Sequence, residues 1–384
     1  MFLNRVLNLD SLLKKKSFFL FGPRGTGKTS LIKHQLPEYP RFDLLRSELY
    51  LRLNNHPHEL EAMIMKTDNP SLVIIDEIQK IPILLNEVHR LIEERGIRFL
   101  LTGSSARKLK KDPDVNMLGG RAWEANLFPL TSREIPDFQL DRYLQYGGIP
   151  NVYLGEEPTE ELDAYASMFL MGEIKAEGVV RNIQAFSRFL EVAALTNGTM
   201  LNFTEIASDT GIPVSTVREY YHILEDTFFG FMLPAWTKSI KRKPISTAKF
   251  YLFDLGVKNL LAQAGMPVPA SNAHGEAFEH FIALELRAYL SYHRIKKKLS
   301  YWRTQHGYEV DFIIGNEIAI EIKTTKKVTN KHLKGLNLLH EEGICQHYYL
   351  VSQDPIERKM NHCIALHWTT FLDKLWKGEL FHSA

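Results

Sequence analysis

A glycine-rich segment that could bind phosphate follows an apolar run near the amino terminus. Residues 22–29 read Gly-Pro-Arg-Gly-Thr-Gly-Lys-Thr and come directly after Phe18-Phe19-Leu20-Phe21. Glycines at this spacing let several backbone N–H groups point at one phosphate, and a helix that begins behind them adds its positive end. Lys28 would neutralise the β- and γ-phosphate oxygens, and Thr29 would offer a hydroxyl to Mg²⁺. The segment therefore predicts a P-loop that binds ATP and Mg²⁺. The residues to which we assign nucleotide binding are Gly22, Pro23, Arg24, Gly25, Thr26, Gly27, Lys28, Thr29 and Ser30.

A second apolar run, Ser71–Ile75, ends in the paired acids Asp76 and Glu77. This arrangement is what the metal side of a P-loop enzyme requires, because an aspartate can hold Mg²⁺ through water while a neighbouring glutamate polarises the attacking water. A solvated acidic turn would look the same in isolation. About 50 residues after a P-loop, the pair instead predicts a metal position at Asp76 and a catalytic base at Glu77.

Two further residues are candidates for the same nucleotide site. The run Ile97–Leu101 leads into Thr102-Gly103-Ser104-Ser105, where Ser104 is placed to reach the γ-phosphate or orient water, or else caps a turn. Arg121 follows Leu118-Gly119-Gly120. It could act in trans as an arginine finger, act in cis as a sensor, or lie on the surface, and the sequence leaves these alternatives open.

A different kind of constellation occurs near residue 310. The runs 308–314 and 318–323 read YEVDFII and IAIEIK, separated by Gly315-Asn316-Glu317. If these three residues form the loop of a hairpin, Asp311 lies opposite Glu321, and Lys323 shares their face. Opposed like charges destabilise a hairpin unless a divalent cation and the lysine neutralise them. A two-residue loop would instead turn Asp311 away, so the metal site depends on this register.

The composition indicates a folded, water-soluble protein of several domains. The chain has 384 residues, 45% of them hydrophobic and 24% charged, which is ordinary for globular proteins. Its net charge is +2, so a nucleic-acid surface must be a local patch. The two cysteines lack CxxC spacing, and no apolar run approaches the roughly 18 residues of a membrane span. We expect a cytoplasmic protein with no membrane contact.

The amino-terminal motifs together resemble the AAA-type branch of the P-loop ATPases. The glutamate beside Asp76 distinguishes them from the GTPase and kinase branches. The segments LVIIDEIQK, LLTGSSARKL, GGRAWEANLFPLTSREI and YGGIPNVYL resemble a family of archaeal and bacterial ATPases, over essentially the whole chain. The resemblance implies an α/β fold in which a parallel sheet carries the nucleotide site.

The carboxyl-terminal constellation resembles the core of the PD-(D/E)XK nucleases. In that family the acids hold Mg²⁺ and the lysine assists the nucleophile, so the resemblance implies metal binding by Asp311 and Glu321 and catalysis by these acids with Lys323. A helix glutamate that follows a glycine by four residues commonly completes the metal site. Gly275 and Glu279 fit, on an expected helix 271–291, so the resemblance implies Glu279 as a further metal ligand. Glu309-Val310 stands where the family often has a proline. An ordinary charged hairpin is the alternative.

The middle of the chain resembles a winged helix-turn-helix. Residues 155–190 look helical, as an ATPase lid would, and residues 201–217 predict two helices with a turn at Gly211 and a cap at Ser215. The apolar positions expected to pack are Ile206, Ala207, Ile212, Val217 and Leu224. The exposed face of the second helix carries little positive charge, which favours packing over DNA contact. The basic tract 238–243 (KSIKRK) could contact a nucleic-acid backbone or be a solvated linker.

Smaller features leave their alternatives open. His56 and His58 flank Pro57 and look like loop residues rather than metal ligands. Tyr301 and Trp302 could stack on bases or pack at a strand edge.

These observations predict an α/β protein of three parts: an AAA-type P-loop ATPase domain (residues 1–150), a helical lid and winged helix (151–238), and a PD-(D/E)XK nuclease-like domain (239–384). The expected function is ATP hydrolysis coupled to metal-dependent cleavage, with DNA as the expected partner and homo-oligomers left open. The alternative is a nucleotide-dependent switch whose carboxyl-terminal domain binds a protein or nucleic acid without cleaving it.

Overall fold

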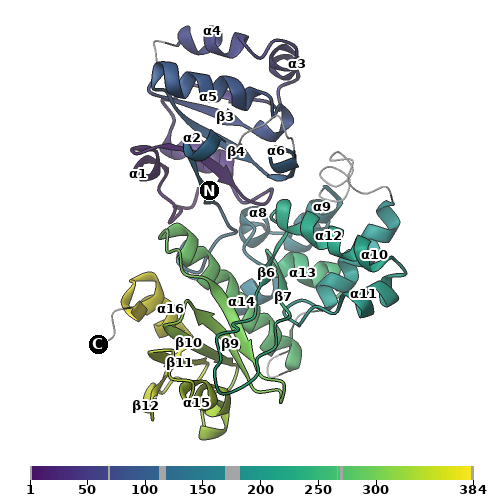
Figure 1. Ribbon diagram of the computed structural model, residues 1–384, viewed down its shortest axis with the longest axis vertical. Coiled ribbons are helices and arrows are strands. Elements are labelled where there is room, and N and C mark those ends of the chain that lie inside the picture. The colour runs from purple at the N-terminus through teal and green to yellow at the C-terminus, as the bar shows by residue number, and fades with distance from the viewer. Residues whose placement is uncertain are drawn as a thin grey trace.

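The computed structural model describes residues 2–67, 70–111, 118–168, 182–265, 267–268 and 271–381. Three parts are visible in Figure 1: an amino-terminal α/β domain at the top, a helical region at the right, and a carboxyl-terminal α/β domain at the bottom. The long helix α14 (Asn272–Tyr292) lies where the three parts meet.

The amino-terminal domain is built on a five-stranded parallel sheet in the order β2-β3-β4-β1-β5. Parallel strands buried on both faces read as continuous apolar runs, and the interior strand β1 (Ser17–Phe21) has this pattern. Phe19 and Phe21 pack under the helices α3 to α6, while Phe18 and Leu20 pack under α1, α2 and the end of α14. This alternation confirms the predicted α/β fold with a parallel sheet. The elements are β1 (Ser17–Phe21), β2 (Arg41–Asp43), β3 (Leu72–Asp76), β4 (Arg98–Gly103), β5 (Ala122–Asn126), α1 (Leu9–Leu13), α2 (Lys28–Gln35), α3 (Ser47–Asn55), α4 (Glu59–Met65), α5 (Leu84–Arg95), α6 (Arg107–Lys111) and the 3₁₀ turns η1 (Ile78–Lys80) and η2 (Leu118–Gly120).

The middle region is a cluster of helices beside a two-stranded antiparallel sheet. The expected helix-turn-helix is present as α11 and α12, and the left-handed Gly211 ends α11. The predicted cap is wrong: Pro213, not Ser215, precedes α12, and its side chain cannot cap. Of the helical stretch 155–190, residues 169–181 lie outside the described part. The elements are α7 (Leu140–Tyr146), α8 (Pro150–Leu154), α9 (Pro158–Met168), α10 (Ile183–Leu195), α11 (Phe203–Thr210), α12 (Val214–Asp226), β6 (Gly230–Leu233), β7 (Lys249–Leu252) and α13 (Leu255–Leu261).

The pair α11–α12 packs as the apolar pattern predicts. Ile206, Ile212, Val217 and Leu224 are buried in one cluster, and Ala207 packs against it. The outer face of α12 is held against the amino-terminal domain: Glu219 pairs with Arg107, and Lys110 Nζ lies 3.0 Å from Asp226 Oδ1. These contacts engage part of the face that DNA would have to approach.

The carboxyl-terminal domain is a six-stranded mixed sheet in the order β12-β13-β11-β10-β9-β8. Helix α14 covers one face together with α16, and α15 covers the other, so the strands are buried on both sides. Within the described residues, no helix is long and apolar enough to cross a bilayer. The elements after α14 are β8 (Leu299–Arg303), β9 (Glu309–Ile314), β10 (Ile318–Lys323), η4 (Asn330–Leu333), α15 (Lys334–His340), β11 (His347–Ser352), β12 (Arg358–Met360), β13 (Cys363–His367), α16 (Trp368–Trp376) and η5 (Glu379–Phe381).

Candidate functional site

The phosphate cradle, residues 22–29, connects β1 to α2. At Gly22 a Cβ atom would lie 2.2 Å from the backbone oxygen of Leu127, so only glycine fits there. Gly27 adopts a left-handed conformation (φ 91°) as the cap of α2, which glycine adopts at no steric cost. The loop therefore brings backbone N–H groups and a helix amino terminus to one place, as an anion site requires.

The lysine of the cradle lies folded over its own loop. Lys28 Nζ donates hydrogen bonds to the backbone oxygens of Gly22 (2.7 Å) and Pro23 (3.0 Å). Its side chain is buried in the loop. A phosphate seated in the cradle would offer this ammonium stronger, charged acceptors in the same place. Lys28 thus lies in the loop where a phosphate would bind. Thr26 stabilises the same loop by donating a hydrogen bond to Pro23 O (2.8 Å).

The predicted metal position lies beside the cradle, at the end of β3. Asp76 is 3% exposed, and its carboxylate accepts hydrogen bonds from Thr29 Oγ1 (3.3 Å) and Thr102 Oγ1. Hydroxyl and carboxylate oxygens are the ligands that Mg²⁺ prefers. The donor set therefore fits Mg²⁺, with Thr29 and Asp76 as its holders. Thr102 orients Asp76 from β4, a role that the sequence interpretation did not assign.

Glu77 lies next to this position in a left-handed backbone conformation (φ 61°), which is uncommon outside glycine. Such conformations cost energy and cluster at functional sites. Its Oε2 accepts hydrogen bonds from Ser104 Oγ (3.3 Å) and from the Nε2 of Gln79, and Gln79 Nε2 also reaches Ser104 Oγ (3.3 Å). The structure thus brings Glu77 and Ser104 together. Gln79, two positions after Glu77, is a polar residue of this site that the sequence interpretation missed.

Arg121 lies away from the cradle. In the parallel pairing of β1 and β5, Ser17 lies opposite Ala122 and Phe21 opposite Asn126. Arg121 therefore precedes the amino end of β5, roughly 17 Å along the sheet from the end of β1 where the cradle begins. Its side chain pairs with Glu93 of α5. This position argues against the cis-sensor alternative, because the cradle of the same chain lies beyond the reach of the side chain. The trans role and the surface role stay open.

A cavity of about 430 Å³ adjoins the cradle. Gly25, Gly27 and Ser30 line one side, and residues of α8 and α9 line another. Arg24, also in the predicted set, is exposed at the tip of the loop. Arg5 borders the cavity: it donates from Nη1 to Thr26 O (2.7 Å) and pairs through Nε with Glu134 Oε1 (3.0 Å). The cavity is large enough to hold a nucleoside beside the phosphates.

The register of the carboxyl-terminal hairpin is the one that the metal site needs. Ile314 pairs with Ile318 and Phe312 with Ile320 in the antiparallel β9–β10 ladder, around the three-residue turn 315–317. The same register brings Asp311 beside β10, where its Oδ2 accepts a hydrogen bond from the backbone N–H of Ile322 (2.6 Å). The prediction of a three-residue loop is confirmed.

The two acids of the hairpin are buried together. Asp311 and Glu321 are each 6% exposed. Burial and the charge of Glu279 raise the pKa of Asp311 to about 7, and burial and the charge of Asp311 raise the pKa of Glu321 well above its usual value. Glu321 Oε2 is buried without a hydrogen-bond partner. An orphaned carboxylate oxygen beside a second carboxylate fits a divalent cation, so these residues could hold Mg²⁺.

The remaining predicted residues border this pair. Lys323 Nζ lies 2.6 Å from Glu321 Oε1. Glu279 approaches from α14, but its Oε1 accepts hydrogen bonds from Tyr251 Oη (2.6 Å) and Lys249 Nζ (3.2 Å), both on β7. The sequence interpretation missed Lys249 and Tyr251. A charged residue at the start of the otherwise apolar run 249–253 was the signal that could have found the lysine.

We use the term acid cluster for the carboxylates Glu279, Glu309, Asp311 and Glu321.

Tyr301 and Trp302 of the neighbouring strand β8 are fully buried, so they pack and do not offer a stacking surface for bases.

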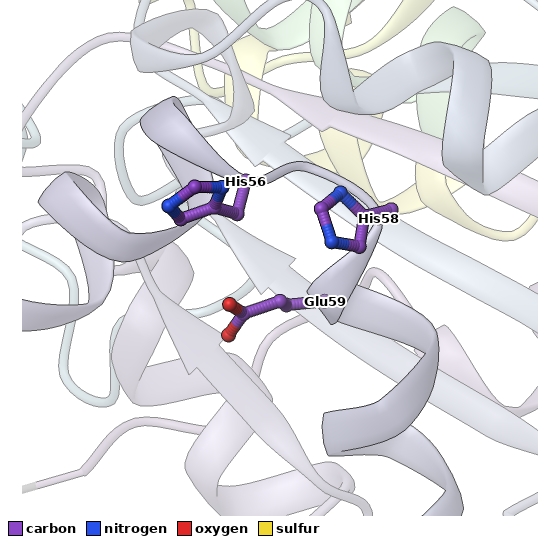
Figure 2. Close-up of side chains that lie close together, drawn as sticks. All are labelled: His56, His58 and Glu59. Carbon is purple, nitrogen blue, oxygen red and sulfur yellow. The ribbon is translucent and has the colours of Figure 1, made fainter.

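A third group of potential ligands lies at the corner between α3 and α4. Figure 2 shows His56, His58 and Glu59 side by side, and one ligand atom from each lies within 4.8 Å of the others. The sequence interpretation overlooked Glu59 as their neighbour. The Glu59 carboxylate already pairs with Arg52, and both imidazoles are exposed. We therefore assign no metal to this corner.

Comparison with known families divides the chain into three matches. Residues 14–136 match a family described as AAA domain. Residues 137–267 match a domain of unknown function (DUF8612), and residues 274–371 match another (DUF4143). The family descriptions thus name neither a winged helix nor a nuclease, and both assignments stay predictions.

Proteins of similar sequence cover different shares of this chain. An uncharacterized protein of Haemophilus influenzae is 23% identical over 62% of this chain and 67% of its own length. An uncharacterized protein of Methanocaldococcus jannaschii is 23% identical over 84% of this chain and 78% of its own. An AAA-ATPase of Arabidopsis thaliana is 38% identical, over 17% of this chain and 12% of its own.

Among solved structures, a STAND protein of Pyrococcus horikoshii, described as a signal transduction ATPase, aligns at 11% identity and a TM-score of 0.24. The alignment covers 77% of this chain and 48% of that one, so the chain spans about half the length of this relative. The match over residues 14–136 and the geometry of the cradle support nucleotide binding. The amino-terminal part of this chain is therefore an AAA-type P-loop domain, joined to two domains whose families have no assigned function.

Proposed function

We propose that this protein binds and hydrolyses ATP with Mg²⁺ in its AAA-type domain, and that its carboxyl-terminal domain is a metal-dependent nuclease of the PD-(D/E)XK type that acts on DNA. The residues proposed for hydrolysis are Glu77 as base and Ser104 as its partner, with Thr29 and Asp76 on the metal. Glu77 suits the role because the hydrogen bonds from Ser104 and Gln79 fix its carboxylate beside the cradle.

The observation that carries the nuclease proposal is the buried pair Asp311 and Glu321 with the orphaned Glu321 Oε2. Two adjacent buried carboxylates are costly without a cation, and a protein that needed only stability would replace them with apolar residues. In such a site a divalent cation activates water and stabilises the charge that develops on a phosphate. The pair is therefore explained by metal-dependent chemistry better than by packing.

The side chains around the pair have separate tasks in this proposal. Lys323, which is about a third exposed, reaches outward from Glu321 to a position from which it can hold the nucleophile or the phosphate. The backbone N–H of Ile322 fixes the orientation of Asp311. Glu279 supports the site from α14, where Tyr251 and Lys249 hold its carboxylate.

DNA as substrate is supported by exposed positive charge near residue 240. Lys238, Lys241 and Lys243 are exposed, whereas Arg242 anchors the tract by pairing with Glu341 and with Glu342 (3.2 Å). An anchored segment that presents three lysines can neutralise phosphates without a large ordering cost. We propose this tract, rather than α12, as the contact with the nucleic-acid backbone, and we propose the winged helix as a packing module.

The test is cleavage of single-stranded, duplex and branched DNA by the purified full chain with Mg²⁺ or Mn²⁺. Wild type is expected to cleave at least one substrate, and Asp311→Ala is expected to cleave none. Asp373→Ala on α16 is the matched control, because Asp373 is an exposed aspartate of the same domain. Lys28→Ala impairs ATP binding but leaves the acid cluster unchanged. Comparing its cleavage with that of wild type therefore separates the nuclease activity from ATP hydrolysis. Absence of cleavage in wild type on every substrate would contradict the proposal.

A second candidate function is a nucleotide-dependent switch whose carboxyl-terminal domain binds a partner without cleaving it, and one set of contacts favours it. Helix α14 carries Glu279 near one end and Tyr292 at the other, and Tyr292 Oη accepts hydrogen bonds from the backbone N–H of Phe128 (3.1 Å) and from Arg5 (3.4 Å). Arg5 also contacts the cradle through Thr26. One helix thus joins the two sites.

If the switch is the function, ATP should change binding of a DNA or protein partner without cleavage. Tyr292→Phe should weaken that dependence, since it deletes the hydroxyl but keeps the ring. Tyr289→Phe on the same helix is the control. Cleavage that Asp311→Ala abolishes would contradict a switch without chemistry.

A further inference from the structure

Lys249 reaches the acid cluster from outside the hairpin and is almost completely buried. Its side chain is 5% exposed, and its Nζ lies 2.6 Å from Glu309 Oε1 and 3.2 Å from Glu279 Oε1. The same ammonium lies 5.1 Å from the ring centroid of Tyr301, which is fully buried. A buried lysine is placed this way only if its charge is needed, because taking an ammonium out of water costs several kcal/mol.

The position of Lys249 is set by β7. This strand pairs with β6 of the middle region, and residues two apart on a strand share a face. Tyr251 accordingly reaches the same carboxylate and donates to Glu279 Oε1 (2.6 Å). Lys249 and Tyr251 thus hold Glu279 from one side, and Glu309 is held by Lys249 and by Arg303 (2.6 Å).

The charges divide the acid cluster into two halves. Glu279 and Glu309 share the Lys249 ammonium, which occupies the space between them. Among the described residues, Lys323 is the only cation within salt-bridge distance of Glu321, none lies that close to Asp311, and Glu321 Oε2 has no hydrogen-bond partner. When all four carboxylates are ionised, as metal binding requires, Lys249, Lys323 and Arg303 leave the acid cluster with one net negative charge. One divalent ion reverses this charge to one positive, and a second would raise it to three in a buried site.

We propose that Lys249 is a built-in cation that takes the place of a second divalent ion, so that the acid cluster binds one ion, at Asp311 and Glu321. This inference rests on the proposed metal-dependent function and specifies its stoichiometry. Lys249 is a positioning residue: it keeps the carboxylates of Glu279 and Glu309 away from the metal and gives the site a fixed charge. The site is thereby a one-metal site in which protein supplies the second cation.

The test is a count of bound Mn²⁺ ions, by electron paramagnetic resonance of free Mn²⁺ during titration of the nucleotide-free full chain. All chains carry Asp76→Asn, so that the phosphate cradle contributes no ion. The parent is expected to bind one ion and Asp311→Asn none. Lys249→Met, which keeps the length and removes the charge, is expected to bind two, because Glu279 and Glu309 become free ligands.

Two controls isolate the position of the charge. Lys249→Arg keeps a cation there and should bind one ion. Arg303→Met removes a cation from Glu309, but Arg303 is 35% exposed and water can replace it, so one ion is again expected. If Lys249→Met does not fold, Lys249→Gln, which also removes the charge but keeps a polar side chain, should bind two ions in its place.

The outcomes separate this inference from the proposed function. One ion in the parent and one in both neutral Lys249 variants overturns the inference and leaves a metal-dependent nuclease standing. Two ions in the parent, or two in Arg303→Met, also overturn it. No ion in the parent overturns the inference together with the metal-dependent function.

Discussion

The phosphate cradle comes from one continuous stretch of chain, whereas the acid cluster is assembled from α14, β9 and β10 and is completed by Lys249 on β7. In the cradle, Lys28 Nζ donates to two backbone oxygens of its own loop. In the acid cluster, Glu321 Oε2 has no hydrogen-bond partner. The lysine of the first site is thus satisfied within its loop, whereas the second site carries an electrostatic cost that a cation would relieve.

This difference leads to different expectations for substitutions. Loss of a residue from the cradle should weaken ligand binding and leave stability almost unchanged. Loss of an acid from the acid cluster should change stability itself, in a direction that depends on metal and pH.

The largest effect is expected for Lys28→Ala. The substitution removes the compact positive charge from the cradle, and hydrogen bonds to charged groups contribute about 1.5–3 kcal/mol each. We expect ATP to bind about 100-fold more weakly, measured by calorimetry. The melting temperature should change little, because the two lost hydrogen bonds to the loop are offset by no longer burying an ammonium. Lys33→Ala, an exposed lysine on the same helix, is the control. A large drop in stability of Lys28→Ala would contradict the view that the cradle is organised by its backbone.

A second prediction separates binding from turnover. Glu77→Gln keeps the shape of the side chain but cannot act as a base, so we expect ATP affinity close to wild type and hydrolysis slower by about 100-fold or more. Phosphate release under saturating ATP measures this. Glu48→Gln, an exposed glutamate on α3, should hydrolyse ATP like wild type. Unchanged turnover in Glu77→Gln would remove Glu77 from the mechanism.

The third prediction concerns metal and stability. An ion that binds only the folded protein stabilises it by about 2.7 kcal/mol at 100 times its dissociation constant. Mn²⁺ should therefore raise the melting temperature of the wild-type chain, and Asp311→Asn should lose most of this increase while it keeps ATP hydrolysis. Scanning calorimetry with and without Mn²⁺ measures it, and Asp373→Asn serves as control. If Mn²⁺ raised the melting temperature of Asp311→Asn as much as that of wild type, the ion would bind elsewhere.

The phosphate cradle and the acid cluster could be predicted from the sequence to different extents. The cradle could be predicted residue by residue because the chemistry of a P-loop requires adjacent positions, and β1 and β3 lie within one residue of the apolar runs that predicted them. The hairpin register could be predicted because a three-residue loop and the side-chain alternation agree.

What the sequence did not reveal depends on contacts between distant segments. Lys249 meets Glu279 across 30 positions, and a single sequence does not show which strand lies beside α14. Gln79 was missed because its role arises from the left-handed turn at Glu77. The alternatives for Arg121 stayed open because the sequence does not show that its end of β5 lies away from the cradle.

A fourth, smaller effect should appear in the pH dependence of stability. The folded pKa of Asp311, raised to about 7 by burial and by Glu279, lies above the ordinary value of about 3.9. A raised pKa gives stability that is complete below about pH 4 and is lost as pH rises to about 7. Metal-free wild type should therefore lose stability over this range relative to Asp311→Asn, in denaturant titrations at each pH.

Two other buried acids titrate in the same range, because burial raises the pKa of Glu285 to about 7 and that of Asp254 to about 6. Both are present in wild type and in Asp311→Asn, so the difference between the two chains reports the coupled pair Asp311 and Glu321. Saturating Mn²⁺ should remove the pH dependence of the stability difference between the two chains, since the ion holds both carboxylates ionised. A difference that persists in Mn²⁺ would mean that the ion does not bind these acids.

The smallest effect on an isolated chain is expected for Arg121→Ala. Its pair with Glu93 is on the surface, where ion pairs contribute little, so stability and ATP affinity should match wild type. Arg95→Ala, a surface arginine of the neighbouring helix α5, is the matched control. Because Arg121 lies at the edge of the sheet opposite its own cradle, any role in hydrolysis must come from a second copy of the chain. Wild-type turnover per chain should then rise with protein concentration, and Arg121→Ala should remove that rise and nothing else. Turnover that is independent of concentration in both chains would leave Arg121 as a surface residue and the AAA-type domain as an ATPase that works alone.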